Sequence, residues 1–447
     1  MARETPVVPF GRSPHVICEI KRSSPSRGEI NAELQPAAQA GRYVGAGITS
    51  ISVLTEEDHF SGSLLDLMEI KRAFPYVSVL RKDFLLYPED IDVSFRAGAD
   101  AVLLIASIFD PPELREMISR TKSLGIDALV EVHDPEEVSM VRDIKPRLTG
   151  INSRDLHTFH VDLLHPVRLK AFIDWETTLV FESGIKGREE AAFAAAAGFD
   201  CLLVGEAVVR QPDLIDGIVT GLSTATAGDF WGRLYGRKRE GRPLVKICGL
   251  TNKADVDLAI ENGADMLGFI FADSPRKTNG SFVKSLGIPA AGDPPRVAVV
   301  VADSGRLLTE IPDLLRHGYL DAVQFHGDEG PDECFSLAHP YYKALRIGDP
   351  AGVEAIRSYR CPRVLLDAFA PGLQGGTGKR LSASAIEAAT AIQPVWLAGG
   401  INPDNVEEIV TNYGPELIDL ASGVELSPGK KDPEKVRRLF GRIAAGG

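Results

Sequence analysis

The stretch LVKICGLTN, residues 244–252, restarts midway along the chain an architecture that residues 15–206 have already completed once. It begins with an apolar, β-branched run typical of a short buried strand, and a glycine ends this run just after a lysine and a cysteine. Strand-like runs alternate with helix-like runs on both sides of it. The stretch therefore divides the chain into two α/β units of similar design.

Before this stretch, eight strand-like runs are each followed by a helix-like run, such as residues 64–74 and 112–124. Repeated strand–helix units predict a parallel sheet, and eight of them in roughly 200 to 250 residues predict a closed (β/α)8 barrel. We expect the strands at residues 15–20, 50–55, 77–82, 101–107, 128–132, 148–153, 178–183 and 201–206.

Eight further strand-like runs follow, so we expect two tandem (β/α)8 TIM barrels; a single barrel plus another α/β domain is the alternative. The expected domains are residues 1–222 and 244–447. Residues 223–243 are the expected linker, because they contain Thr, Gly and a basic run but show no period. The strands of the second barrel are expected at residues 244–249, 266–272, 296–302, 321–326, 341–346, 363–368, 394–399 and 417–423.

The composition indicates a globular protein whose ligands are small. The 447 residues carry a net charge of −13, which repels nucleic acid and acidic membranes but still allows a local basic pocket for a small anion. No apolar run approaches the roughly 20 residues of a membrane helix, and the N-terminus has no apolar signal core. The five cysteines and nine histidines lack disulfide-framework or metal-ligand spacing. We therefore expect a cytoplasmic monomer or weak oligomer that binds no nucleic acid, membrane or metal.

Polar residues end the expected strands of the first barrel, where barrel enzymes build their active sites. Glu19 and Lys21 occupy alternate positions, so their side chains point to the same side of the strand. Lysines beside carboxylates suit general acid–base chemistry, although buried ion pairs that only stabilise the barrel mouth are the alternative. Glycines after strands seven and eight would let backbone N–H groups approach a phosphate. The candidate residues are Glu19, Lys21, Lys82, Glu131, Asn152, Glu182, Ser183, Gly184, Gly205 and Glu206.

The second barrel ends its strands with fewer charges and more glycines. A cysteine and an aspartate at facing strand ends would make a base and acid pair, although a lone cysteine is more often an inert buried side chain. The candidate residues are Cys248, Arg276, Gln324, His326, Asp367, Gly399, Gly400, Ser422 and Gly423, with Gln324 and His326 as substrate-binding residues.

The first barrel resembles the indole-3-glycerol phosphate synthase family over nearly its whole length. The motifs that carry the resemblance, in the family's order, are CEIKRSSPS (18–26), LRKDF (80–84), VEV (130–132), GINSRDL (150–156) and ESGI (182–185). The resemblance implies ring closure of 1-(2-carboxyphenylamino)-1-deoxyribulose 5-phosphate, with loss of carbon dioxide and water, to indole-3-glycerol phosphate.

The same resemblance implies roles for individual residues. Lys82 matches the acid that activates the substrate carbonyl, and Glu131 matches a partner in acid–base steps. Glu19 and Lys21 match residues that serve the later dehydration. The matching substrate-contact residues are Asn152, Glu182 and Ser183 near the reacting atoms, Phe60, Phe84 and Arg154 around the anthranilate ring and its carboxylate, and Ser24, Gly184, Gly205 and Glu206 on the phosphate side.

The second barrel resembles the phosphoribosylanthranilate isomerase family. The motifs are KICG (246–249), SPR (274–276), QFHG (324–327), LD (366–367), GGTG (375–378), AGGINP (398–403) and SGVE (422–425). They imply an Amadori rearrangement of N-(5-phosphoribosyl)anthranilate, with Asp367 as general acid on the ring oxygen and Cys248 as general base at C2. Arg276 would bind the anthranilate carboxylate, and the pairs Gly399-Gly400 and Ser422-Gly423 would hold the phosphate.

The two resemblances imply consecutive steps of tryptophan biosynthesis, because the isomerase product is the synthase substrate. Both reactions need only acid–base chemistry, so we expect no cofactor and phosphorylated anthranilate-derived substrates. The first expected strand begins at His15, so the helical extension that covers the barrel mouth in relatives is expected to be shortened. One alternative is therefore an active isomerase with an impaired, structural or regulatory first barrel, and a more distant one is an unrelated phosphate-binding barrel.

Overall fold

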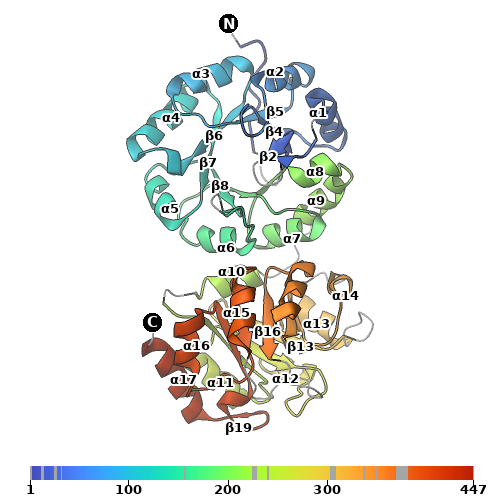
Figure 1. Ribbon diagram of the computed structural model, residues 1–447, viewed down its shortest axis with the longest axis vertical. Coiled ribbons are helices and arrows are strands. Elements are labelled where there is room, and N and C mark those ends of the chain that lie inside the picture. Colours follow the sequence, from blue (N-terminus) through green and yellow to red (C-terminus); the bar gives the residue numbers. More distant parts are fainter. Residues whose placement is uncertain are drawn as a thin grey trace. The chain divides into compact units, whose positions relative to one another are not determined.

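The computed structural model describes residues 3–11, 15–24, 28–31, 33–155, 158–223, 229–238, 241–302, 309–335, 339–347, 350–368 and 381–445. The chain divides into two compact units, Met1–Thr226 and Ala227–Gly447. Each unit contains a closed barrel of eight parallel strands surrounded by helices (Figure 1), which confirms the two expected (β/α)8 barrels. Residues 25–26 and 156 of two motifs, and the whole motif at residues 375–378, lie outside the described residues.

In the first barrel, β1 pairs with both β4 and β10 and thereby closes the ring. All eight barrel strands overlap the expected ranges. They are β1 (His15–Ile20), β4 (Ser50–Leu54), β5 (Ser78–Lys82), β6 (Ala101–Ile105), β7 (Asp127–Val132), β8 (Leu148–Asn152), β9 (Thr178–Glu182) and β10 (Cys201–Val204), beside a hairpin of β2 (Ser23–Ser24) and β3 (Gly28–Glu29). The helices are α1 (Pro36–Gly45), α2 (Leu64–Ala73), α3 (Pro88–Ala97), η1 (Ala106–Ile108), α4 (Pro111–Leu124), α5 (Pro135–Val141), α6 (Leu164–Lys170), α7 (Arg188–Ala196), α8 (Glu206–Arg210) and α9 (Leu214–Ser223).

In the second barrel, β11 pairs with both β12 and β18. Its strands also overlap the expected ranges. They are β11 (Leu244–Cys248), β12 (Met266–Ile270), β13 (Arg296–Val300), β14 (Ala322–Phe325), β15 (Tyr341–Ile347), β16 (Val364–Ala368), β17 (Trp396–Ala398) and β18 (Leu417–Leu420), beside a hairpin of β19 (Glu425–Ser427) and β20 (Lys430–Lys431). The helices are α10 (Phe230–Tyr235), α11 (Lys253–Glu261), α12 (Gly280–Ser285), α13 (Glu310–Arg316), α14 (Pro331–Phe335), η2 (Pro350–Ser358), α15 (Ala383–Thr390), α16 (Val406–Tyr413), η3 (Ser422–Val424) and α17 (Pro433–Ala445).

The segment before β1 packs into the first barrel. Phe10 is fully buried in an apolar cluster formed mainly by the amino-terminal halves of the strands, with Ile17, Leu129 and Val180 among its neighbours. Burial of a phenylalanine side chain stabilises the fold by roughly 1.5 to 3 kcal/mol. This apolar filling leaves the carboxyl ends of the strands to the polar residues.

The expected linker is partly helical, and its residues 227–243 belong to the second unit. Within it, α10 places the Trp231 ring 5.9 Å from the Trp396 ring, and Tyr235 donates a hydrogen bond to Glu416 Oε2 at 2.7 Å. Six residues are too few for a helical period to stand out in the sequence, so pattern alone does not reveal this helix.

We searched the described residues for membrane-spanning helices, metal-binding clusters and disulfides. No helix among them combines the length and apolar character needed to span a bilayer. Within the same residues, no three His, Cys, Asp or Glu side chains are grouped so that they could hold a metal ion. All five cysteines are described, and each is a buried free thiol.

Candidate active sites

Ionisable side chains from three strands meet at the carboxyl end of the first barrel. On β1, Glu19 Oε2 lies 2.6 Å from Lys21 Nζ, and Glu19 Oε1 lies 3.6 Å from Lys82 Nζ. Lys82, at the end of β5, also donates a hydrogen bond to Glu182 Oε2 on β9 at 3.0 Å. Lys82 therefore reaches from β5 to carboxylates on β1 and β9, two strands that both pair with β10.

Neighbouring charges keep Lys82 and Glu19 ionised. Burial alone would lower the pKa of Lys82, but the carboxyl groups of Glu182, Glu19 and Glu131 outweigh it, so this pKa is raised. Burial would likewise raise the pKa of Glu19, but the ammonium groups of Lys21 and Lys82 outweigh it, so this pKa is lowered. At neutral pH, Lys82 is therefore a cation and Glu19 an anion.

Two buried carboxyl groups, Glu131 on β7 and Glu182 on β9, flank the strand that carries Asn152. Asn152 Nδ2 donates a hydrogen bond to Glu131 Oε1 at 3.2 Å. Burial would raise the pKa of Glu131, but His133 and Lys82 outweigh it and lower this pKa to about 2. Burial and the neighbouring Glu131 charge raise the pKa of Glu182 to about 8. The pair therefore shares one proton at neutral pH.

Two glycines, Gly150 within β8 and Gly205 just after β10, leave the space that Glu182 and Glu19 fill. A Cβ atom on Gly150 would lie 2.1 Å from Glu182 Oε1, and one on Gly205 would lie 2.3 Å from Glu19 Oε2. Both distances are far below van der Waals contact. A side chain at Gly205, expected as a phosphate-binding turn, would therefore have to displace the carboxylate of Glu19.

The remaining candidates of the first barrel lie on loops or at element ends. Ser183 has a φ of 67°, uncommon for a residue with a side chain, and its carbonyl accepts a hydrogen bond from Ser153 Oγ at 3.0 Å. The Arg154 backbone N–H donates to Asn152 Oδ1 at 3.0 Å. The other candidates are Ser24, buried in β2, Phe60, on the loop after β4, Gly184, with a φ of 81°, and Glu206, which begins α8.

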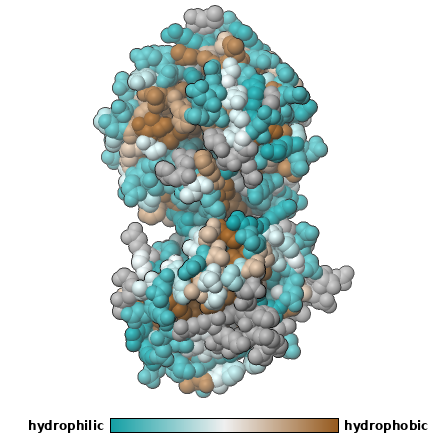
Figure 2. Space-filling model, viewed as in Figure 1, coloured by the Kyte–Doolittle hydropathy of each residue, from teal (hydrophilic) through white to brown (hydrophobic). Residues whose placement is uncertain are grey.

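Phe84 stands apart from the buried cluster, because its side chain is 50% exposed. Other apolar side chains near the ends of β5 and β6 are also exposed, among them Leu86, Tyr87 and Ile108. Figure 2 shows hydrophobic residues gathered on the surface of this unit beside α4.

All nine candidate residues of the second barrel line one pocket at the carboxyl ends of its strands. The pocket holds about 820 Å³ of space and is open to solvent. Its lining also includes Asp419 from β18, which the sequence-based candidates omit. Residues separated by up to 175 positions, from Cys248 to Gly423, are thus brought together as their placement at strand ends predicts.

Cys248 lies beside a buried lysine of its own strand. Burial raises the pKa of the Cys248 thiol, and the ammonium group of Lys246 offsets part of this rise. Lys246 Nζ pairs with Asp419 Oδ2 at 2.6 Å and donates a hydrogen bond to Gln324 Oε1. A Cβ on Gly268 of the adjacent strand would lie 2.7 Å from Cys248 Sγ, so only glycine leaves room for the thiol.

Asp367 is joined to a row of polar side chains across the pocket. Its Oδ2 lies 3.1 Å from His326 Nε2, and His326 Nδ1 lies 3.3 Å from Gln324 Nε2. Tyr342 OH donates to Gln324 Oε1 at 2.9 Å. These contacts fix the orientation of Asp367 opposite Cys248.

Arg276 is held by a carboxylate outside the predicted set. Its Nε and Nη2 atoms lie 2.8 to 3.0 Å from the two oxygens of Glu425. Glu425 Oε1 also lies 2.9 Å from Lys431 Nζ, which donates a hydrogen bond to the backbone oxygen of Cys248 at 2.6 Å. Sequence pattern does not reveal Lys431, because the β19–β20 hairpin returns it to the barrel from beyond the last strand.

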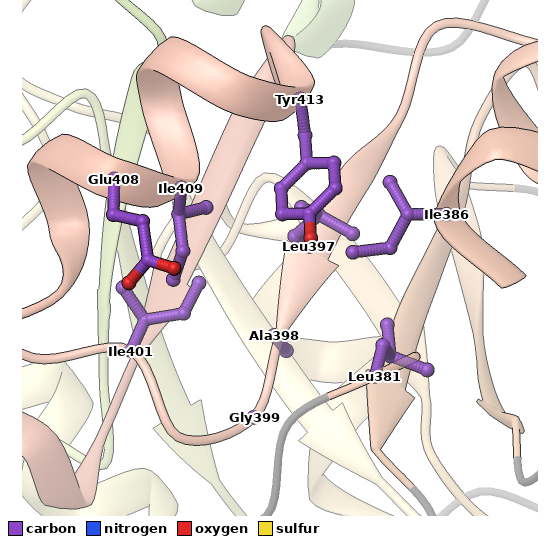
Figure 3. Close-up of a pocket in the computed structure, with 9 residues that line it drawn as sticks. All are labelled: Leu381, Ile386, Leu397, Ala398, Gly399, Ile401, Glu408, Ile409 and Tyr413. Atoms are coloured by element: carbon purple, nitrogen blue, oxygen red, sulfur yellow. The ribbon is translucent and has the colours of Figure 1, made fainter. Parts of the chain in front are cut away.

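At the end of the pocket where we expect the phosphate, the backbone adopts the positive φ angles that glycine permits. Gly399 and Gly400 have φ values of 91° and 66°, and Asn405 Nδ2 donates to the Gly400 oxygen at 2.8 Å. A Cβ on Gly423 would lie 1.9 Å from the Ile401 oxygen. Gly399 also borders a separate cavity of about 410 Å³, between side chains of α15 and α16 (Figure 3).

Lys246, Asp419 and His133 are the clearest omissions from the sequence-based candidates. Lys246 precedes Cys248 by two positions in one strand, and His133 follows Glu131 by two. The alternation of side chains along a strand is the signal that could have found both.

Comparisons with known proteins agree with this division. Residues 8–219 match the family model of indole-3-glycerol phosphate synthase, and residues 245–442 match that of N-(5'phosphoribosyl)anthranilate (PRA) isomerase. A tryptophan biosynthesis protein of Phytophthora nicotianae is 31% identical over 90% of this chain and 86% of its own length.

The multifunctional tryptophan biosynthesis protein of Schizosaccharomyces pombe is 30% identical over 96% of this chain. The chain spans 59% of the length of that relative and 62% of two others of the same name. The crystal structure of phosphoribosyl anthranilate isomerase from Thermus thermophilus is 35% identical, with a TM-score of 0.41, over 45% of this chain and 98% of its own. The chain belongs to the family of tryptophan biosynthesis proteins in which an indole-3-glycerol phosphate synthase domain precedes an N-(5'-phosphoribosyl)anthranilate isomerase domain.

Proposed function

We propose that this chain catalyses two consecutive steps of tryptophan biosynthesis. The second barrel isomerises N-(5-phosphoribosyl)anthranilate to 1-(2-carboxyphenylamino)-1-deoxyribulose 5-phosphate, and the first barrel closes the ring to indole-3-glycerol phosphate. The convergence of Cys248, Arg276 and Asp367 on one pocket carries the proposal, because these groups can bind an aromatic carboxylate and move protons. The cluster around Lys82 supports a second activity rather than a structural role for the first barrel.

In the second barrel, Asp367 donates a proton to the ribose ring oxygen as the ring opens. Cys248, as a thiolate beside Lys246, removes the proton from C2, and the resulting enolamine becomes the ketose. Arg276 binds the anthranilate carboxylate at one end. The backbone N–H groups after β17 and β18 bind the phosphate at the other.

In the first barrel, Lys82 donates a proton to the substrate carbonyl as the aromatic carbon attacks it. Lys82 suits this role because the surrounding carboxylates keep it protonated. Glu131 serves as its acid–base partner, and loss of carbon dioxide follows. Glu19 and Lys21 then assist the loss of the hydroxyl group as water. Asn152, Glu182 and Ser183 position the substrate.

We also propose that the chain works in the cytoplasm as a monomer or weak oligomer. The five free thiols support a reducing compartment.

Supplying each substrate separately to the purified full chain tests both activities. Loss of N-(5-phosphoribosyl)anthranilate fluorescence measures isomerisation. Formation of indole-3-glycerol phosphate from synthetic 1-(2-carboxyphenylamino)-1-deoxyribulose 5-phosphate measures ring closure without any need for the second barrel. A chain that carries out the first reaction but not the second would refute the bifunctional proposal.

A further inference from the structure

His133 connects the first-barrel cluster to a helix outside the barrel. Its Nε2 atom lies 2.9 Å from Glu131 Oε1, and its Nδ1 atom lies 3.2 Å from Glu137 Oε2 in the first turn of α5. The Glu137 carboxylate also accepts a hydrogen bond from the His133 backbone N–H at 2.8 Å. The ring is therefore held between two carboxylates, one in the cluster and one on α5.

This geometry favours the imidazolium form. A neutral imidazole has one nitrogen without a proton, which would face a carboxylate oxygen unfavourably on one of the two sides. The side chain of His133 is only 14% exposed, so solvent screens these charges weakly. The third titratable group that faces His133 is His165 on α6, whose pKa is lowered by burial, so it is neutral at physiological pH. The pKa of His133 agrees with this geometry. Burial would lower it, but the charges of Glu131 and Glu137 outweigh burial and raise it to about 10.

The contacts of Glu131 show what this cation does for the cluster. Glu131 Oε1 accepts a hydrogen bond from the amide of Asn152 and lies 2.9 Å from His133 Nε2, an ion-pair contact without hydrogen-bond geometry. The Oε2 atom of Glu131 and the Oε1 atom of Glu182 are both buried, and neither has a hydrogen-bond partner within the described part of the chain. The imidazolium stabilises the charge on Glu131, whereas Lys82 lies 3.0 Å from Glu182 Oε2 and faces the other carboxyl group.

We propose that His133 is a positioning residue of the ring-closure site, whose imidazolium keeps Glu131 ionised and oriented. The inference rests on the proposed synthase activity of the first barrel. It adds to that activity a charged group that does not itself contact the reacting atoms.

The test compares the pH dependence of ring closure in the full chain with that of His133→Asn. Without the imidazolium, Glu131 takes up a proton at higher pH, by about 1 to 3 units, the usual effect of an adjacent opposite charge. The acid limb of the kcat/KM profile should therefore move upward, with most of the loss in kcat rather than KM. His165→Asn is the matched control, because it removes a neutral imidazole from the same region. His165→Asn should leave the acid limb of the kcat/KM profile at its wild-type pH.

NMR titration of the imidazole in the wild-type chain provides a second measurement that needs no variant activity. The His133 signal, assigned by its loss in His133→Asn, should remain that of an imidazolium past neutral pH, and Glu137→Gln should lower its pKa. A wild-type imidazole that titrates near 6.5, or a His133→Asn profile that matches the wild type, would overturn the inference. Absence of ring closure by the wild-type chain would instead overturn the proposed function, so the two failures are distinguishable.

Discussion

Arg276 and Glu425 form a forked ion pair at the mouth of the second barrel, with nitrogen–oxygen distances of 2.8 to 3.0 Å. The pairing uses Nε and Nη2 of the arginine, so Nη1 is the nitrogen that can meet a ligand carboxylate. Lys431 continues the network from Glu425 to the backbone oxygen of Cys248. The proposed carboxylate-binding residue is thus connected to the strand end that carries the proposed base.

Glu425→Gln should weaken substrate binding by the isomerase more than its chemistry. Loss of the carboxylate frees the Arg276 side chain, and KM should rise by about 10- to 100-fold, because hydrogen bonds between charged groups contribute about 1.5 to 3 kcal/mol. Steady-state isomerase kinetics measure the effect. The exposed Glu434→Gln serves as control, and an unchanged KM in Glu425→Gln would show that Arg276 needs no such support.

Removal of the proposed base or acid should separate the two activities. Cys248→Ala and Asp367→Asn should each lower isomerase kcat by about 10²- to 10⁴-fold, the usual contribution of general acid–base catalysis. Ring closure from synthetic substrate should stay at the wild-type rate, because the first barrel has its own site. Loss of both reactions in either variant would contradict two independent sites.

Lys82→Met should have the converse effect. The variant keeps most of the side-chain volume but removes the cation shared by Glu19 and Glu182. Ring closure should fall by about 10²- to 10⁴-fold while isomerisation is unchanged. The same exchange at the exposed Lys122 is the control. Near-normal ring closure in Lys82→Met would mean that another group is the acid.

Glu182 should make the first barrel less stable as pH rises. Its pKa is raised from the usual 4.5 to about 8, so between these values the folded chain holds a proton that the unfolded chain releases. Stability is therefore lost as pH rises across this window. Glu182→Gln lacks this titration. The melting temperature of the variant minus that of the wild type should therefore increase from pH 5 to pH 9. A constant difference between the two curves would contradict the raised pKa.

The isomerase should become faster as the solution becomes more alkaline. Burial raises the pKa of the Cys248 thiol, and a base must first be deprotonated to act. The kcat/KM of isomerisation should therefore rise with pH beyond neutrality, and iodoacetamide should alkylate Cys248 with the same dependence. A profile that is level from pH 6 to pH 9 would exclude the thiolate as the base.

The fold was predictable because strand ends and strand interiors differ in composition. All sixteen barrel strands overlap the expected ranges, since parallel strands are buried on both faces and appear as apolar runs. The helix α10 was missed because it is only six residues long. Phe10 was also missed, because a single aromatic residue in a proline-containing segment carries no period that would place it in a barrel core.

The candidate sites were predictable to the extent that strand order fixes position. Cys248 and Asp367 share a pocket because both end strands of one barrel. The residues that support them required coordinates. Lys431 returns through a hairpin, and the pairing of His133 with Glu137 depends on where α5 begins. Sequence pattern gives the side of a strand that a residue occupies, but not which charges meet there.

Three glycines that pack against reactive side chains should tolerate substitution poorly, although they have no chemical role of their own. Gly150, Gly205 and Gly268 carry no reactive atom, yet an alanine at any of them would occupy the space of Glu182, Glu19 or Cys248. A substitution at any of these glycines should therefore lower activity even though every reacting residue is intact. In mutational scans for tryptophan auxotrophy, these three codons should rank with those of the reactive residues themselves.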